Sequence, residues 1–135
     1  MGQLNSLIVL GRLLLASLFL LGGVNKILNF SATQASMQAV QLEPSLLLLI
    51  LTIVLELGGG LLIAIGRWYV FPAALLLALF TLATNVYFHN FWAFEGEQQQ
   101  VQLSFFFKNL SIAGGLFLIA AGSVVARKGD HDYSE

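Results

Sequence analysis

The chain has 135 residues, of which 58% are hydrophobic and 10% charged, and its mean hydropathy is +0.85. Because a soluble domain carries about a quarter charged residues, this composition excludes an ordinary soluble protein and indicates an integral membrane protein. The net charge of -1 offers no basic surface for nucleic acid, and the absence of cysteine excludes disulfides and electron transfer through thiols of this chain.

Four apolar runs are each long enough to cross a bilayer, which takes about 20 residues in a helix. They cover residues 4–27, 46–65, 71–91 and 103–126. Backbone polar groups have no water to bond in hydrocarbon, so these segments must be helices. The sequence therefore predicts an all-α fold, a four-helix transmembrane bundle that forms a single domain over residues 1–135.

Two connectors between these runs are long and polar. In residues 29–44, Ser31 and Gln34 have the spacing of a capping box ahead of apolar residues, which predicts a short helix lying at the membrane interface. Residues 93–102 carry acids and three consecutive glutamines, and we expect them to connect the third and fourth spans.

The basic residues near the helix ends predict the orientation. Arg67 in the connector 66–70, and Arg127 with Lys128 after the fourth run, fall on one side of the membrane, whereas the connector 93–102 holds only acids. Because basic loops stay in the cytoplasm, we expect a multi-pass protein of the cell inner membrane with both termini cytoplasmic. Lys26 argues against this weakly, since a lysine at a helix end can extend to the headgroups.

Glu56 is the single ionisable residue of the second run, and Arg12 lies within the first. A charge near the bilayer centre costs about 3 kcal/mol and usually has a partner. With the N-terminus inside, Arg12 lies about 12 Å along its helix and Glu56 at a comparable depth, at 1.5 Å per residue. We therefore predict a buried ion pair between Arg12 and Glu56, which either fixes helix register or belongs to a proton or substrate site. The following Gly58–Gly60 would let a neighbouring helix approach closely.

A second set of polar residues gathers toward the opposite face of the membrane, on three of the predicted helices. Its members are Asn25, Lys26, Asn85, His89, Lys108 and Asn109. One interpretation is that they only lie near the headgroups. The other is a shallow pocket, open to the outer face, that accepts an anion or a carbonyl group. No metal is expected, since His89 is the only histidine in a membrane segment and paired histidine ligation of haem would need another.

Four stretches of the chain together resemble the DoxX family, over nearly the whole length. They read GRLLLASLFLLGGVNKILNF, ELGGGLLIAIG, FHNFW and QLSFFFKNLSIAGGLFLI in chain order. The resemblance implies a small four-helix bacterial membrane protein, with family members named after a subunit of a terminal quinol oxidase or of a thiosulfate to quinone oxidoreductase, and others linked to redox homeostasis. It also implies that the polar positions of the family fall here on Arg12, Lys26, Glu56, His89, Lys108 and Asn109. Family members that take part in thiol chemistry would need partners here, because this chain has no cysteine.

Three functions are compatible with these features, and the sequence leaves open whether the chain is an enzyme. The first is a redox-associated subunit, working with a partner redox protein, that binds a quinone or a similar lipophile with a polar head, with Lys26, His89 and Lys108 as donors to its carbonyl oxygens. The second is a non-catalytic scaffold or assembly factor for another membrane protein. A transporter is less favoured, because four helices seldom enclose a path without oligomerisation. Small residues at fourfold spacing, such as Gly60 with Ala64, predict a homodimer.

Overall fold

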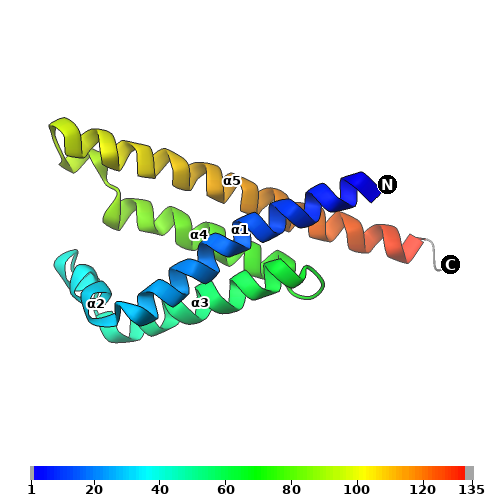
Figure 1. Ribbon diagram of the computed structural model, residues 1–135, viewed down its shortest axis with the longest axis horizontal. Helices are drawn as coiled ribbons and strands as arrows, with labels where there is room; N and C mark the ends of the chain where they lie inside the picture. The colour runs from blue at the N-terminus through cyan, green and yellow to red at the C-terminus, as the bar shows by residue number, and fades with distance from the viewer. Residues whose placement is uncertain (1, 133–135) are drawn as a thin grey trace. The chain divides into compact units, whose positions relative to one another are not determined.

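The computed structural model describes residues 2–132 and the side chains of residues 5–126. Its elements are α1 (Gly2–Leu28), α2 (Phe30–Ala39), α3 (Ser45–Ile65), α4 (Val70–Phe88), the 3-10 helix η1 (Phe91–Ala93) and α5 (Gly96–Asp132), coloured from blue to red in Figure 1. Residues 2–132 contain no strand. The all-α class predicted from the sequence is confirmed.

Four helical segments are long and apolar enough to cross a membrane. They are Asn5–Leu28, Ser45–Ile65, Val70–Ala93 and Gly96–Ala126. Large aliphatic side chains such as Leu21 and Val54 remain 69% and 63% exposed in these segments, as expected where lipid rather than water surrounds the helix. The predicted set of four transmembrane helices is therefore confirmed, and the chain is an integral membrane protein.

The fourth span begins earlier than the sequence suggested. α5 starts at Gly96, which has a φ of 61°, so most of the expected connector 93–102 is helix. Glutamine is a good helix former, and Glu97 in the first turn interacts favourably with the positive end of the helix dipole. These polar residues therefore extend the helix beyond the apolar run and do not interrupt the helix.

The helix expected between the first two spans is α2, whereas its location at the membrane interface stays a prediction. The predicted capping box is not used, because the helix begins at Phe30 and its N-cap residue is Asn29. Gln34 instead donates from Nε2 to Oγ of Ser45 over 3.4 Å. Glu43 Oε2 accepts the backbone N–H of Ser45 at 2.6 Å, which satisfies one of the free donors that begin α3.

The chain divides into two compact units, residues 1–73 and residues 74–135. In the first unit α1 and α3 run side by side in opposite directions (Figure 1). A Cβ atom built on Gly60 would lie 3.1 Å from Leu20 and 3.4 Å from the carbonyl oxygen of Ala16, whereas one on Gly58 would meet nothing within 4 Å. Of these two glycines, Gly60 is therefore the one that permits the close approach of the helices.

In the second unit α4 and α5 form a hairpin that turns through η1. Asn85 Nδ2 donates to the carbonyl oxygen of Phe106 over 3.1 Å and so joins the two helices. Near the turn, Phe106 makes edge-to-face contacts with Phe91 and Trp92, with ring centroids 5.2 and 6.1 Å apart. Such contacts each stabilise by about 0.5–1.5 kcal/mol beyond burial, so this end of the hairpin is held by both polar and aromatic groups.

Candidate functional site

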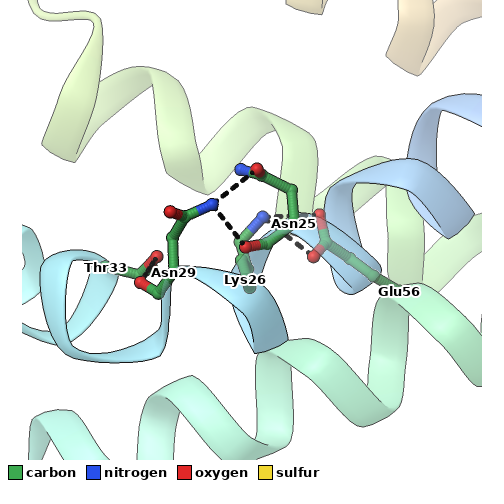
Figure 2. A network of polar contacts seen from close by, with 5 residues as sticks. All are labelled: Asn25, Lys26, Asn29, Thr33 and Glu56. Carbon is green, nitrogen blue, oxygen red and sulfur yellow. Dashed lines mark hydrogen bonds and ion pairs between the residues drawn. The ribbon is translucent and has the colours of Figure 1, made fainter.

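The carboxylate of Glu56 is paired with the ammonium group of Lys26. Lys26 lies in the last turn of α1 and Glu56 in the middle of α3. Nζ of Lys26 donates to Oε1 over 3.0 Å and lies 2.9 Å from Oε2 (Figure 2). The side chain of Glu56 is 7% exposed and that of Lys26 is 25% exposed. Lys26 therefore compensates a charge that would otherwise be costly at this depth.

Two glycines of α1 make room for this carboxylate. A Cβ atom on Gly22 would lie 3.1 Å from Oε1 of Glu56, and one on Gly23 would lie 2.7 Å from Cγ of Leu57. A side chain at Gly22 would therefore displace the carboxylate of Glu56, and one at Gly23 would displace the side chain of Leu57 beside it. The glycine pair four and three residues before Lys26 is thus part of the site, and the sequence analysis did not include it.

Arg12 does not reach Glu56, so the predicted Arg12–Glu56 ion pair is wrong. Its Nη1 atom donates instead to the carbonyl oxygen of Gly66 over 3.3 Å. The prediction assumed that the N-terminal end of α1 lies level with the C-terminal end of α3. The contacts of Gly60 with Ala16 and Leu20 instead fix a register in which Arg12 faces the C-terminal end of α3. The charged residue of α1 that lies level with Glu56 is Lys26.

Polar contacts continue from Lys26 into the junction of α1 and α2 (Figure 2). Asn29 Nδ2 donates to Oδ1 of Asn25 over 2.9 Å and to its backbone oxygen over 3.1 Å. Thr33 Oγ1 donates to the backbone oxygen of Asn29 over 2.9 Å. Asn25 and Asn29 are exposed. The predicted candidate Asn25 therefore stabilises the end of α1 together with Asn29, a residue that sequence reasoning missed.

Asn85 and Asn109 form a buried amide pair in the second unit. Asn109 Nδ2 donates to Oδ1 of Asn85 over 2.8 Å, while Asn85 uses its own Nδ2 on Phe106. Asn85 is 2% exposed, so both ends of its side chain are satisfied by α5. An unsatisfied amide at this depth would cost about 1–3 kcal/mol. The pair fixes the register of α4 against α5.

His89 directly follows the last residue of α4, and its backbone N–H bonds the carbonyl oxygen of Asn85 over 3.2 Å. Its Nδ1 atom is 2.8 Å from Oε1 of Gln102, and its ring stacks on that of Phe105 with centroids 5.1 Å apart and planes at 30°. In the tautomer that donates from Nδ1 to this amide oxygen, Nε2 is free to accept a hydrogen bond. Sequence reasoning found His89 but missed Gln102 and Phe105, which the fourfold spacing on α4 could not reveal because they belong to α5.

Lys108 extends over the same aromatic ring. Its Nζ atom lies 5.6 Å from the ring centroid of Phe105, within the range of a cation–π interaction. Lys108 is exposed, and no carboxylate among the side chains of residues 5–126 pairs with it. An ammonium group and an imidazole nitrogen therefore border one partly exposed aromatic ring.

The six residues predicted to bind a ligand fall into two groups. Asn25 and Lys26 belong to the first unit, whereas the other four, Asn85, His89, Lys108 and Asn109, come together in the hairpin of the second unit. A single pocket built from both groups stays a prediction. Within the part of the chain that the structure describes, no three histidine, aspartate or glutamate residues are placed to hold a metal ion.

Comparison with known proteins identifies the family. The DoxX family model matches residues 7–90. The chain is similar to the inner membrane protein YphA of Escherichia coli strain K12, with 30% identity over 114 residues that cover 84% of this chain and 81% of the relative. It is also similar to the inner membrane protein YqjF of the same strain, with 39% identity over 113 residues and coverage of 84% and 81%. No solved structure matches the chain. Because the family match covers more than half of the residues and both relatives align over most of their length, the chain belongs to the DoxX family.

Proposed function

We propose that this protein is a redox-associated membrane subunit that binds the headgroup of a quinone, or of its reduced quinol form, at the turn of the α4–α5 hairpin. The observation that carries the proposal is that His89 and Lys108 both lie against Phe105, with ring centroids 5.1 Å apart and an ammonium to ring distance of 5.6 Å. An aromatic surface bordered by few polar groups is typical of sites for small lipophilic ligands.

The two polar groups suit the two oxygens of such a headgroup. Lys108 has three N–H donors and no carboxylate partner among the described side chains, so it can donate to a carbonyl oxygen of the quinone or to a hydroxyl oxygen of the quinol. His89 Nε2 can accept a hydrogen bond from a quinol hydroxyl, because Nδ1 is occupied by Gln102 at 2.8 Å. Phe105, which is 44% exposed, offers a face for stacking. The arrangement thus differs from the expected set of three donors, since His89 acts as an acceptor.

Lys26 has a different role in this proposal. Its ammonium group is engaged by both oxygens of Glu56, so moving it to a ligand would leave a carboxylate that is 7% exposed without compensation. We therefore assign Lys26 to the stability of the α1–α3 pair and leave ligand binding to the hairpin. Asn85 and Asn109 hold α4 and α5 in register and so position His89 beside Phe105.

The cellular setting follows from the relatives and from the charges. Both relatives are named inner membrane proteins, and we extend that location to this chain, with both termini cytoplasmic because Arg67, Arg127 and Lys128 share one side. The site then opens toward the outer face. A partner redox protein would exchange electrons with the quinone, since this chain has no cysteine of its own.

A homodimer is part of the same proposal. The fourfold spacing of Ala74 and Ala78 on α4 suggested it from the sequence, but both residues are 0% exposed in the single chain, so the dimer is proposed without a located interface. Light scattering of the purified protein in a mild detergent, with the detergent mass subtracted, should give the mass of two chains. The mass of one chain would contradict the dimer and would leave the quinone site unaffected.

Fluorescence of Trp92 tests the quinone site. The chain has two tryptophans, so Trp68→Phe leaves only Trp92, whose ring lies 6.1 Å from that of Phe106 beside the proposed site. Titration of this variant in detergent, under reducing conditions, with the quinol form of a short-chain ubiquinone or menaquinone analogue should quench the emission to a saturating level. Lys108→Gln and His89→Phe, made in the same background, should each raise the apparent Kd about tenfold, the effect of roughly 1.4 kcal/mol.

Arg67→Gln in that background is the matched control, because it removes a positive charge far along the chain from the hairpin turn. Its titration should coincide with that of the parent. Quenching that rises linearly and equally in all variants would mean that the quinone only partitions into the micelle. If, in addition, a second membrane protein is recovered with this chain at a constant ratio, the two results together would favour the function of a non-catalytic scaffold.

A further inference from the structure

Arg12 is a cation whose partners within the described chain do not neutralise it. A guanidinium group has five N–H donors, and Arg12 uses Nη1 on the carbonyl oxygen of Gly66. Its Nε atom is buried without a hydrogen-bond partner. The one ion pair among the described side chains joins Lys26 and Glu56, so no carboxylate of residues 5–126 compensates this charge.

The turn that Arg12 contacts carries a second arginine. Gly66, whose carbonyl oxygen Arg12 contacts, is followed directly by Arg67, which is exposed. The guanidinium carbon of Arg67 lies 4.8 Å from the ring centroid of Trp68. Trp68 and Tyr69 are 59% and 70% exposed, and such aromatic residues are enriched at the level of lipid headgroups. The turn between α3 and α4 therefore carries Arg67, Trp68 and Tyr69, and Arg12 contacts Gly66 directly before them.

The guanidinium group of Arg12 lies against the residue that ends α3. Gly66 ends α3 in the left-handed conformation, with a φ of 71°, and its N–H bonds the carbonyl oxygen of Leu62 over 3.0 Å. A Cβ atom built on Gly66 would collide with the guanidinium group of Arg12. Only a glycine therefore leaves space for Arg12 to lie against the end of α3, one residue from Arg67.

We propose that the α3–α4 turn binds the phosphate of an anionic phospholipid between Arg12 and Arg67. Arginine binds phosphate through paired N–H groups in a fixed fork, and Arg12 retains unused donors for it. Arg12 contacts Gly66, the residue that ends the apolar helix α3, which places the site at the boundary of the hydrocarbon, where lipid phosphates lie. This depth and the neighbouring aromatic residues favour a lipid over a free phosphate ion.

Thermal unfolding of delipidated protein tests the site. Dioleoylphosphatidylglycerol, added to the full chain in a non-ionic detergent, should raise the Tm to a saturating level, whereas dioleoylphosphatidylcholine and inorganic phosphate should not. In Arg12→Gln/Arg67→Gln the lipid concentration for half the effect should rise at least about tenfold, as expected for losing two cations near a lipid surface. Lys108→Gln, which removes one cation elsewhere, should respond like the wild type.

The outcomes separate the sources of the anion. Equal stabilisation by phosphatidylcholine, or an unchanged response of the double variant, would overturn the site. Stabilisation by inorganic phosphate alone would overturn the lipid as its ligand. If the double variant does not fold, Arg67→Gln and Arg12→Lys serve in its place: each should weaken the response to phosphatidylglycerol, and a response equal to that of the wild type in both would overturn the proposal.

Discussion

Lys26 and Glu56 meet between α1 and α3, with Nζ 3.0 Å from Oε1 and 2.9 Å from Oε2. The carboxylate of α3 thus has its counterion on the neighbouring helix, at the last turn of α1. Because Lys26 is 25% exposed and Glu56 is 7% exposed, the lysine can reach toward the headgroups while the glutamate cannot. The stability of α1 against α3 therefore depends on the pair, and Glu56 is the member less able to stand alone.

The register of α1 against α3 explains why Arg12 has no part in this pair. Arg12 contacts Gly66, which lies ten residues beyond Glu56, or about 15 Å along a helix. The same register places Gly60 opposite Ala16 and Leu20. Close contact at the glycines sets this alignment, and the first residues of α1 extend past the end of α3 as a consequence.

Replacement of Gly60 by leucine should weaken this contact, whereas the same change at Gly58 should not. A Cβ atom at Gly60 would already lie 3.1 Å from Leu20, and one at Gly58 would meet nothing within 4 Å. Overpacking of this kind costs about 1–3 kcal/mol. The unfolding free energy in a titration with sodium dodecyl sulfate should fall by that amount for Gly60→Leu and stay unchanged for Gly58→Leu. Equal losses would show that Gly60 does not face α1.

The number of spans and the helical class could be predicted from the sequence because both follow from the length of the apolar runs. The pairing of charges could not, because it depends on how far one helix slides along its neighbour. Residues 4–11 are as apolar as the rest of the first run, so nothing in the composition marks where α1 passes the end of α3. The alignment assumed from the sequence was wrong by a few helical turns, so Arg12 was predicted as the partner of Glu56 in place of Lys26.

The hairpin shows the same limit. The fourfold spacing of Asn85 and His89 on one helix, and the placement of Lys108 and Asn109 on the next, indicated polar faces. The contacts between the two helices depend on the turn through η1. This turn places Gln102 and Phe105 against His89. Because the start of α5 at Gly96 was not anticipated, Gln102 was assigned to the connector 93–102, and Phe105 was given no role.

The amide pair of the hairpin should be coupled. Asn109→Leu removes the donor to Oδ1 of Asn85, which is 2% exposed, and should cost about 1–2 kcal/mol because the oxygen is left unsatisfied. Adding Asn85→Leu removes that oxygen too, so the double variant should be more stable than the sum of the single losses predicts. Unfolding in the same detergent titration measures the three variants. Additive losses would mean that the two side chains do not interact.

Cysteine labelling should place Gln99 and Ser134 on opposite sides of the membrane. The natural chain has no cysteine, so each single substitution gives one reactive thiol, although Ser134 lies outside the described residues. An impermeant maleimide should label Gln99→Cys in intact cells and Ser134→Cys only after permeabilisation, because Arg67, Arg127 and Lys128 predict cytoplasmic termini. Gln38→Cys, on exposed α2, should behave like Gln99→Cys. Labelling from one side at both Gln99 and Ser134 would require a different number of spans.

Removal of one member of the Lys26–Glu56 pair should harm folding more than removal of both. Glu56→Gln leaves an ammonium group that can move toward the headgroups, while Lys26→Met leaves a carboxylate that is 7% exposed. Breaking a buried pair costs about 3–5 kcal/mol, so we expect Lys26→Met near the upper end of this range and Glu56→Gln near or below the lower end. The double variant should recover most of the loss, since no unpaired charge remains.

A second cycle, Arg12→Met with Glu56→Gln, is the control for this experiment. Arg12 contacts Gly66 and not Glu56, so its effect should add to that of Glu56→Gln within about 0.5 kcal/mol, as for residues without a shared partner. Coupling in this cycle and additivity in the first would restore the pairing that the sequence suggested and would contradict the register of α1 and α3. Quinone titration of the folded Lys26→Met/Glu56→Gln variant then separates stability from binding: because the proposed ligand site lies on His89 and Lys108, its Kd should equal that of the wild type, and a loss of binding would mean that the ion pair belongs to the site.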